Sequence, residues 1–315
     1  MNKPLVTVFG GSGFLGRHAV RALARAGHRI RVAVRHPNLA NYLLPMGHVG
    51  QIQIAKTDVR NDDAVASALR GAHAAVNLVG ILYNGGGQTF DGVHVDAAER
   101  MARAAKAAGA KRFVHISAAG ADPDSDSNYA RTKAEGEQRV RGAFPEAMVL
   151  RPSLVFGPED NFFNRFAALA RISPALPLIG GGHTRFQPVF VGDVAEVVRK
   201  GVQDSITAGK TYELGGPGVY TFKQFMEIVL RETGRKRLLV PLPFPLAALS
   251  SYFLGMLPNP LLTPDQVRLL KTDSVVAPGA PGFAELGVQP DALEAIVPTY
   301  LWRFRPKGQF QEIAP

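Results

Sequence analysis

Three glycines near the start of the chain restrict its fold most strongly. Gly10, Gly13 and Gly16 are spaced three residues apart, directly after the apolar run at residues 5–9 and at the start of a helix-period segment at 14–26. A tight turn between a strand and a helix lets the backbone approach a pyrophosphate, and the free N–H groups of the helix N-terminus favour an anion. The position of this loop therefore predicts a dinucleotide-binding fold.

Strand-like and helix-like segments alternate through the first half of the chain. The apolar, strand-like runs cover residues 5–9, 30–34, 51–56, 74–79, 112–116 and 148–151. The segments with helical periodicity cover residues 14–26, 64–69, 97–108 and 129–144. Continuous apolar strands separated by amphipathic helices indicate a parallel sheet that is covered on both faces. We therefore expect an α/β fold with a doubly wound parallel sheet of the Rossmann type.

Beyond about residue 152 the pattern changes to longer loops rich in proline and glycine. The helices expected there cover residues 162–171, 194–203 and 222–233. Thr221 and Gln224 have the spacing of a capping box for the last of these. We predict a dinucleotide-binding domain at residues 1–155 and a smaller C-terminal lobe at 156–315, with interleaved elements, that faces a substrate, a partner or a membrane.

Composition excludes several kinds of chemistry. The chain has no cysteine, which excludes disulfides, thiolate metal sites, iron–sulfur clusters and a thiol nucleophile. Its histidines lack the spacing of a metal site, so we predict no metal. The net charge is +10, with the excess in the first half, where a phosphate-rich cofactor, an anionic membrane surface, an acidic partner or plain solubility would account for it. No basic run is interleaved with aromatic residues, so nucleic acid is not expected.

The residues at three strand ends fit a cofactor path. A chain that selects NAD usually ends its second strand in Asp or Glu, whereas this chain has Arg35. Arg35, with Arg17 on the first helical turn, can pair with a 2′-phosphate, which favours NADP(H) over NAD(H) unless Arg35 is merely a solvated residue. Asp58 follows the third strand, where it can accept a hydrogen bond from adenine, and Gly80 follows the fourth, where a small residue lets the cofactor pass.

Tyr129 and Lys133 are four residues apart and share one helical face. Together with the glycine loop, this Y-x-x-x-K spacing resembles that of the extended short-chain dehydrogenases/reductases, the class of NAD-dependent epimerases and dehydratases. The resemblance implies that Lys133 lowers the pKa of Tyr129 and contacts the nicotinamide ribose, that Tyr129 exchanges a proton with substrate, and that Ser117 polarises the substrate carbonyl. Residues 151–158 and 190–195 also resemble signatures of this class.

Three residues are thus the catalytic candidates, namely Ser117, Tyr129 and Lys133. The predicted cofactor-binding residues are Gly10, Ser12, Gly13, Phe14, Leu15, Gly16, Arg17, Arg35, Asp58, Val59, Leu78, Val79, Gly80, Tyr129 and Lys133.

The segment after Ser117 departs from the pattern of active enzymes. Tyr129 follows Ser117 by only 12 positions, and residues 118–120 are Ala-Ala-Gly in place of the usual Ser/Thr-rich stretch. This arrangement, together with residues 143–147 and 160–162, resembles the nucleotide-binding accessory subunits of respiratory complex I. The resemblance implies a structural cofactor, whose ribose Tyr129 and Lys133 hold without reaction.

Residues 238–264 carry no charge and follow the basic residues Arg235, Lys236 and Arg237. Prolines leave only 12 uninterrupted apolar residues, at 246–257, whereas a membrane-spanning helix needs about 20. We therefore expect the segment 238–262 to lie on a membrane surface, to dock on a membrane-embedded partner or to pack inside the C-terminal lobe.

The leading hypothesis is an NADP(H)-binding protein of the complex I accessory-subunit type. Its expected partners are complex I or quinone- and membrane-associated proteins, and its expected location is the cytoplasm, peripheral on the inner membrane. The first apolar run leads directly into glycines, so it is expected to be a strand rather than a signal peptide. The alternatives are an active NAD(P)-dependent oxidoreductase or epimerase and a redox-sensing regulator.

Overall fold

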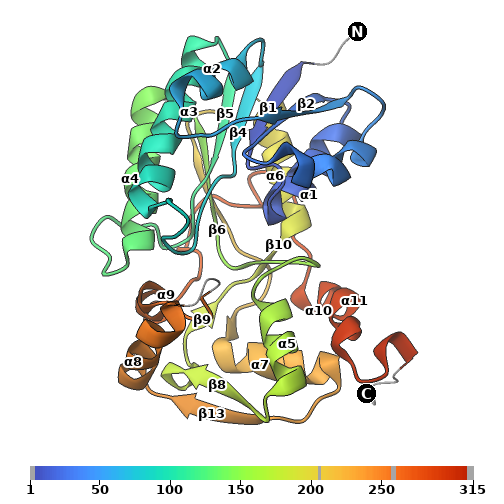
Figure 1. Cartoon of the computed structure of the whole chain (residues 1–315), viewed down its shortest axis with the longest axis vertical. Coiled ribbons are helices and arrows are strands. Elements are labelled where there is room, and N and C mark those ends of the chain that lie inside the picture. Colours follow the sequence, from blue (N-terminus) through green and yellow to red (C-terminus); the bar gives the residue numbers. More distant parts are fainter. Residues whose placement is uncertain (1–3, 205–206, 257–259, 311–315) are drawn as a thin grey trace. The chain divides into compact units, whose positions relative to one another are not determined.

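The computed structural model describes residues 4–204, 207–256 and 260–310 (Figure 1). The chain forms two compact units that interleave along the sequence. Unit 1 comprises Met1–Pro152, Val191–Leu214 and Pro278–Gln289, and unit 2 comprises Ser153–Phe190, Gly215–Ala277 and Pro290–Pro315. The roles predicted for residues 1–155 and 156–315 stay predictions.

Unit 1 contains a sheet of seven parallel strands in the order β11-β6-β5-β4-β1-β2-β3. The strands are β1 (Leu5–Phe9), β2 (Arg29–Val34), β3 (Ile52–Lys56), β4 (Ala74–Asn77), β5 (Arg112–Ile116), β6 (Met148–Pro152) and β11 (Thr211–Leu214). The direction of winding reverses between β1 and β4, and ligands of such sheets bind at the carboxyl ends of the strands beside that reversal. The predicted doubly wound parallel sheet is confirmed.

Helices cover both faces of this sheet (Figure 1). They are α1 (Phe14–Arg25), α2 (Asp62–Leu69), α3 (Ala97–Ala107), α4 (Asn128–Ala143) and α6 (Val191–Gln203). On one face α1 packs against α6, and on the other α3 lies between α2 and α4. Because both faces are covered, the central strands are largely apolar, and side chains such as Phe9 and Phe113 are fully buried.

Two helical segments of unit 1 were not expected from the sequence. The segment η1 (Pro37–Met46) is a 3₁₀ helix that follows β2, and η2 (Asp91–Asp96) is a π-helical turn that leads into α3. Neither has the 3.6-residue periodicity from which α-helices are predicted. Both lie beside the predicted cofactor path.

Unit 2 is built from three two-stranded sheets and several helices. The pairs are β7 (Val155–Phe156) with β10 (Val189–Phe190), β8 (Ala175–Ile179) with β13 (Leu238–Leu242), and β9 (Arg185–Phe186) with β12 (Tyr220–Thr221). The helical elements are α5 (Phe163–Ile172), η3 (Gly180–Gly182), α7 (Phe222–Thr233), α8 (Phe244–Gly255), α9 (Pro264–Leu269), α10 (Leu293–Ile296), α11 (Pro298–Leu301), η5 (Trp302–Phe304) and η6 (Gly308–Phe310).

Phenylalanine rings form much of the core of unit 2. Phe163 and Phe225 are fully buried, and their ring centroids lie 5.2 Å apart in an edge-to-face arrangement. The helix α7 begins with the predicted capping box: the Thr221 hydroxyl accepts from Gln224 N, and Gln224 Oε1 accepts from Thr221 N.

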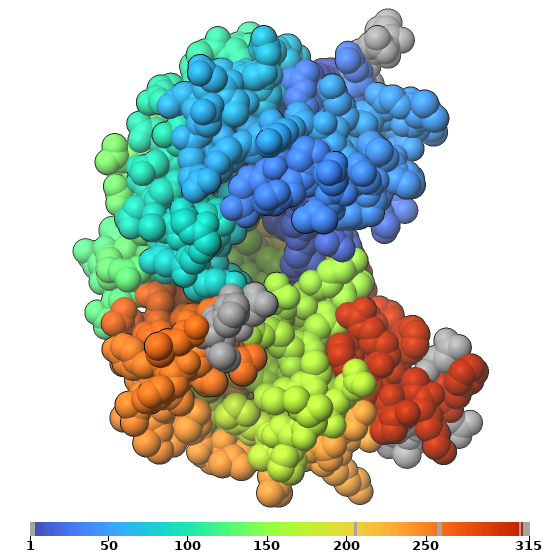
Figure 2. Space-filling view, in the orientation of Figure 1, coloured from blue at the N-terminus to red at the C-terminus, as the bar shows by residue number. Residues whose placement is uncertain are grey.

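The helix α8 exposes large apolar side chains. Its small residue Ala247 is buried, whereas Leu249, Tyr252 and Phe253 are 60%, 61% and 70% exposed. The segment that contains α8 and α9 is orange-brown in Figure 2, where its side chains form part of the surface of unit 2. These large side chains therefore do not pack inside the lobe. Among the described residues, no helix has both the length and the apolar character needed to cross a bilayer.

The approach of α4 to η2 depends on Gly136. A Cβ atom at this position would lie 2.0 Å from the carbonyl oxygen of His94, closer than any real contact allows. Gly142 lies in the same helix, is exposed and has no atom within 4 Å of its would-be Cβ. The two glycines thus differ in what an added methyl group would contact.

We predict opposite effects of alanine at these two positions. Gly136→Ala forces α4 away from η2 and lowers the free energy of unfolding by about 1–3 kcal/mol. Gly142→Ala removes backbone freedom from the unfolded chain and raises the free energy of unfolding by about 0.5–1 kcal/mol. Urea titration of each variant measures both changes. Shifts of the same sign in the two variants would contradict this account of the packing.

Candidate functional site

The turn between β1 and α1 has the geometry of a phosphate-binding loop. Gly10 has φ +76°, and a Cβ there would lie 3.2 Å from the backbone of Leu78. A Cβ on Gly16 would lie 2.2 Å from the carbonyl oxygen of Gly10, so only glycine permits this turn. The helix begins after Gly13, which provides no side-chain cap, and its first turn holds no acidic residue. The N–H groups at this end are therefore suited to an anion.

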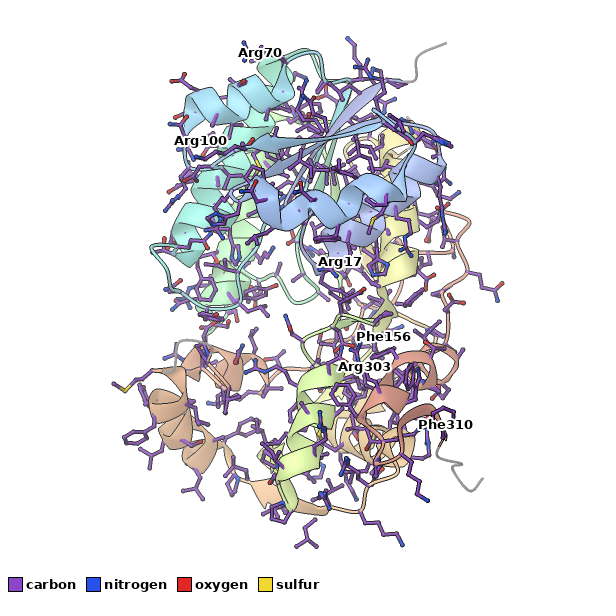
Figure 3. The ribbon with its side chains drawn as sticks, turned by 45° about the vertical axis from the view of Figure 1, so that its right-hand side comes forward. Arg17, Arg70, Arg100, Phe156, Arg303 and Phe310 are labelled. Carbon is purple, nitrogen blue, oxygen red and sulfur yellow. The ribbon has the colours of Figure 1, made fainter. Side chains whose placement is uncertain are left out.

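An arginine and a tyrosine border this loop. The Tyr42 hydroxyl, from η1, donates to the carbonyl oxygen of Ser12 at 2.6 Å. The guanidinium of Arg17, labelled in Figure 3, lies 4.9 Å from the centroid of the Tyr42 ring. Phe14 and Leu15 start α1 and are half-buried. Sequence reasoning missed Tyr42, because the η1 segment that places it has no regular periodicity.

Charged residues cluster at the ends of β2 and β3. Arg60 binds the Asp58 carboxylate with two nitrogens, at 3.0 and 2.7 Å. Hydrogen bonds from the Arg60 side chain and N–H, and the weaker field of Arg35, lower the pKa of Asp58 to about 2. Arg35 is exposed and Val59 is buried. The predicted contact of Asp58 with adenine would therefore share oxygens that Arg60 already binds.

Tyr129 and Lys133 lie in the first two turns of α4. The helix begins at Asn128 because the Ser127 hydroxyl caps it by accepting from Ala130 N. Lys133 is buried, its Nζ donates to the Ile116 carbonyl oxygen at 3.1 Å, and it lies 5.8 Å from the centroid of the Tyr129 ring. The resemblance predicted a paired tyrosine and lysine, and the structure places the two side chains together.

Burial shifts the pKa values of both members of this pair. Burial lowers the pKa of Lys133 to about 8, against the opposing field of Glu137. Burial raises the pKa of Tyr129 to about 12. Because the shift of Tyr129 arises from burial, the expectation that Lys133 lowers its pKa stays a prediction. At pH 7 the site holds an ammonium ion and a protonated phenol.

Ser117 is a buried hydroxyl at the end of β5. Its N–H donates to the Leu150 carbonyl oxygen at 2.7 Å, but its Oγ has no hydrogen-bond partner among the described residues. The structure therefore does not join Ser117 Oγ to Tyr129 or Lys133 by a hydrogen bond. A buried polar atom without a partner costs about 1–3 kcal/mol, so this position fits a group that a bound molecule supplies.

The ion pair between Glu137 and Arg151 joins α4 to the sheet. Arg151 Nε and Nη2 each donate to one Glu137 oxygen at 2.8 Å, and Arg151 Nη1 contacts Glu213 at 3.4 Å. Glu137 is buried one helical turn after Lys133, and Glu213 lies opposite Arg151 on β11. This pairing sets the position of α4 relative to β6 and β11.

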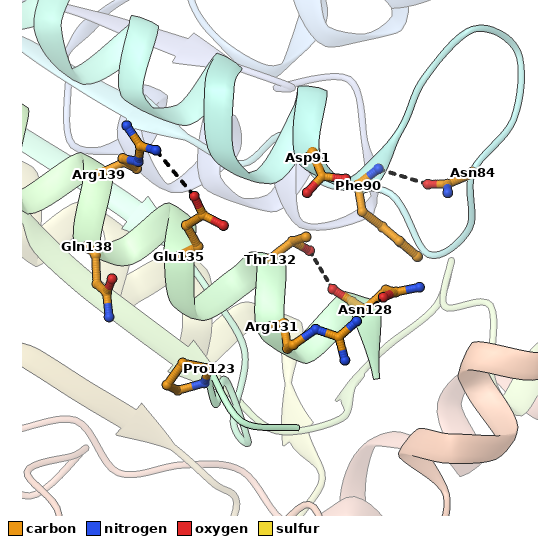
Figure 4. Close-up of a pocket in the computed structure, with 10 residues that line it drawn as sticks. All are labelled: Asn84, Phe90, Asp91, Pro123, Asn128, Arg131, Thr132, Glu135, Gln138 and Arg139. Carbon is orange, nitrogen blue, oxygen red and sulfur yellow. Dashed lines mark hydrogen bonds and ion pairs between the residues drawn. The ribbon is translucent and has the colours of Figure 1, made fainter. Parts of the chain in front are cut away.

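A cavity of about 490 Å³ opens along another face of α4 (Figure 4). Its lining includes Asn84, Asp91, Arg131, Glu135 and Arg139, but not Tyr129 or Lys133. Several of these groups bind each other, as in the ion pair of Arg139 with Glu135 at 3.4 Å. The cavity is thus distinct from the predicted site.

All predicted site residues lie in unit 1, at or after the carboxyl ends of its strands or in the helices that follow. Close contacts join Gly10 to Leu78 and Val79, and Lys133 lies near both Gly80 and Tyr129. Arg35 is close enough to Asp58 to affect its pKa. The roles assigned to these residues stay predictions.

Comparisons with known proteins identify the family. The model of the NAD dependent epimerase/dehydratase family matches residues 6–215. The chain is 36% identical, over 96% of its length and 79% of the relative's, to NADH dehydrogenase (ubiquinone) 1 alpha subcomplex subunit 9, mitochondrial, of Arabidopsis thaliana. It is 32% identical, over 76% of its length and 74% of the relative's, to the ceramide reductase of Caulobacter vibrioides.

Solved structures share the fold. The Escherichia coli NADPH-dependent quinone oxidoreductase QOR2, complexed with NADPH, superimposes with a TM-score of 0.72 at 21% identity, over 92% of this chain and 97% of that one. The fold is thus of the NAD(P)-binding type. Since the family model matches most of the chain, the protein belongs to the NAD dependent epimerase/dehydratase family.

Proposed function

We propose that the protein is an accessory subunit of a respiratory NADH:ubiquinone oxidoreductase that holds NADP(H) as a structural cofactor. The observation that carries this proposal is the likeness of the chain, at 36% identity over 96% of its length, to the Arabidopsis thaliana relative that bears the name of such a subunit. Tyr129 and the buried Lys133 lie together and are suited to hold a nucleotide ribose.

Lys133 supports a binding role for this pair. A shift of its pKa from 10.5 to about 8 means that burying the ammonium costs on the order of 3 kcal/mol of folding stability at pH 7. An apolar side chain at this position would avoid that cost. A buried cation beside Gly80 is suited to hold a ribose hydroxyl of a bound nucleotide through its remaining N–H donors. When bound, a nicotinamide cofactor supplies hydride chemistry.

Three observations support NADP(H) over NAD(H). The β2 end carries the exposed Arg35 instead of a carboxylate, and the Asp58 carboxylate nearby is neutralised by Arg60. Arg17 stacks on Tyr42 beside the glycine loop. A 2′-phosphate at this edge would meet cations, whereas a ribose with two free hydroxyls would lack the usual acidic acceptor.

The helix α8 supports a contact with a lipid surface. Its exposed Leu249, Tyr252 and Phe253 belong to an uncharged segment that follows Lys236 and Arg237. Exposed apolar side chains on one helix are suited to a membrane interface, and cations of the same lobe favour anionic lipid. We propose that residues 238–262 contact the membrane and that the protein is peripheral on it, on the cytoplasmic side of an inner membrane.

A structural cofactor should stay bound during purification and be released when the protein is denatured. After denaturation, we expect about one NADP(H) per chain, because the cofactor is held without turnover, and chromatography identifies it. The native protein is then offered quinones, ceramide precursors and nucleotide sugars while absorbance at 340 nm is followed. Rapid oxidation or reduction of the nucleotide by any of these would contradict a structural cofactor and would favour an active oxidoreductase, the activity named for the Caulobacter vibrioides relative.

Substitution of Arg35 tests whether the site prefers NADPH to NADH. We expect Arg35→Ala to raise the Kd for NADPH about 10- to 100-fold, because a charge-assisted hydrogen bond to the 2′-phosphate is lost, and to change the Kd for NADH less than about twofold. Arg29→Ala, at the opposite end of the same strand, is the matched control and should change neither Kd. Calorimetric titration gives both constants. If Arg35→Ala raised the Kd for NADPH and the Kd for NADH by the same factor, the proposed contact of Arg35 with the 2′-phosphate would be refuted.

The membrane contact is tested with phosphatidylglycerol vesicles. We expect the double variant Leu249→Ser, Phe253→Ser to lower the bound fraction in a sedimentation assay at least about tenfold, because each side chain gains roughly 1 kcal/mol or more on burial in the interface. The control Leu39→Ser, Val49→Ser removes exposed apolar residues of unit 1 and should retain binding. A wild-type protein that does not sediment with the vesicles would count against this contact.

A further inference from the structure

The loop at residues 78–81 passes close to the buried ammonium. It leaves the carboxyl end of β4, and a methyl group on Gly80 would lie 3.4 Å from Lys133 Nζ and 3.8 Å from His94 Nε2. The backbone of this loop therefore forms one wall of the space in which Lys133 would meet a nucleotide ribose. A shift of this loop would change the distance from Lys133 to the ribose of a bound nucleotide.

Two buried side chains hold the amides on either side of Gly80. Asn77 Oδ1 accepts from Val79 N at 3.0 Å, and His94 Nε2 accepts from Ile81 N at 3.1 Å. Asn77 and His94 are only 1% and 2% exposed, so water does not compete for these bonds. The loop is thus fixed by side chains, in contrast to most surface loops.

The hydrogen bonds of His94 define its tautomer. Since Ile81 N–H donates to Nε2, the ring proton lies on Nδ1, which donates to Thr132 Oγ1 at 3.0 Å. The Thr132 hydroxyl in turn donates to the Asn128 carbonyl oxygen at 2.8 Å. Burial, with the nearby charge of Lys133, lowers the pKa of His94 to about 2, which keeps the ring neutral. The imidazole therefore connects the loop to the first turn of α4.

The position of His94 is itself fixed from several sides. It lies in the π-helical turn η2, and Gly136 allows α4 to press against its carbonyl group. Its ring stacks on Phe90 at 5.4 Å and meets the ring of Tyr129 edge-on at 5.3 Å. Asn77 is held in a similar way, because its Nδ2 lies 3.1 Å from Nδ1 of His115 on β5.

We propose that His94 is a positioning residue for the nicotinamide half of the bound nucleotide. Its Nε2 holds the N–H of Ile81, the residue after Gly80, and its ring contacts the ring of Tyr129, so that Lys133 faces a preformed loop. Asn77 does the same for Val79 N–H. This inference rests on the proposed nucleotide binding and adds to it the residues that shape the nicotinamide end of the site.

The test compares the Kd for NADPH with the Kd for a ligand that represents only its adenosine half. Adenosine 2′,5′-bisphosphate carries the adenine, the ribose and the 2′-phosphate of NADPH but lacks the nicotinamide half. We expect His94→Phe, which keeps a ring but removes the acceptor, to raise the Kd for NADPH about tenfold and the Kd for the half-ligand less than about twofold. His94→Gln, whose Oε1 can replace Nε2 as the acceptor, should restore most of the lost NADPH affinity. His73→Phe, an exposed position that precedes β4, is the control and should leave both constants unchanged.

The possible results separate the inference from the proposed function. If His94→Phe raises the Kd for both ligands by the same factor, His94 has a general structural role and the inference is overturned. An unchanged Kd for NADPH overturns it as well. A wild-type protein that binds neither ligand refutes the proposed function and with it the inference. If His94→Phe does not fold, Asn77→Ala provides the same comparison from the other side of Gly80, with the same expected difference between the two ligands.

Discussion

The ion pair of the buried Glu137 with Arg151 is the interaction on which the candidate site depends. It fixes one helix to the strands β6 and β11, and that helix carries Lys133 one turn earlier and Tyr129 two turns earlier. Removing Arg151 would leave the buried carboxylate of Glu137 without its closest cation. The geometry of the site is therefore set by a contact that touches no ligand, and Gly136 adjusts the same helix against η2 from another side.

The properties of the Tyr129 and Lys133 pair come from their surroundings more than from their spacing. The Y-x-x-x-K pattern predicts that the side chains meet, and they do. It does not determine what the ammonium binds. Here Lys133 donates to a backbone carbonyl and lies over the face of the phenol ring, while burial raises the pKa of Tyr129. The same two residues can thus serve proton transfer in one protein and ribose binding in another.

The fold was predictable from sequence because its signals are local. Apolar strands and helix-period segments gave β1, β5 and α7 with the bounds that the structure has, and the capping box at Thr221 was correct. The contacts that shape the site were not predictable. The Asn77 bond to His115 and the stacking of Arg17 on Tyr42 join residues far apart in the chain, and the irregular turns η1 and η2 have no periodic pattern. Such contacts depend on three-dimensional packing, which a single sequence does not encode locally.

The late return of the chain to unit 1 affects how the protein is made. The strand β11 pairs with β6, and α6 covers α1, yet both elements follow an excursion of the chain through unit 2. Glu213 N also donates to the carbonyl oxygen of Pro281, which is translated later still. During synthesis on the ribosome, an emerging first half would therefore expose an unpaired strand edge and an uncovered helix, which are typical sites of chaperone binding and of aggregation. The sheet of unit 1 is complete only after β11, which follows the excursion through unit 2, has left the exit tunnel.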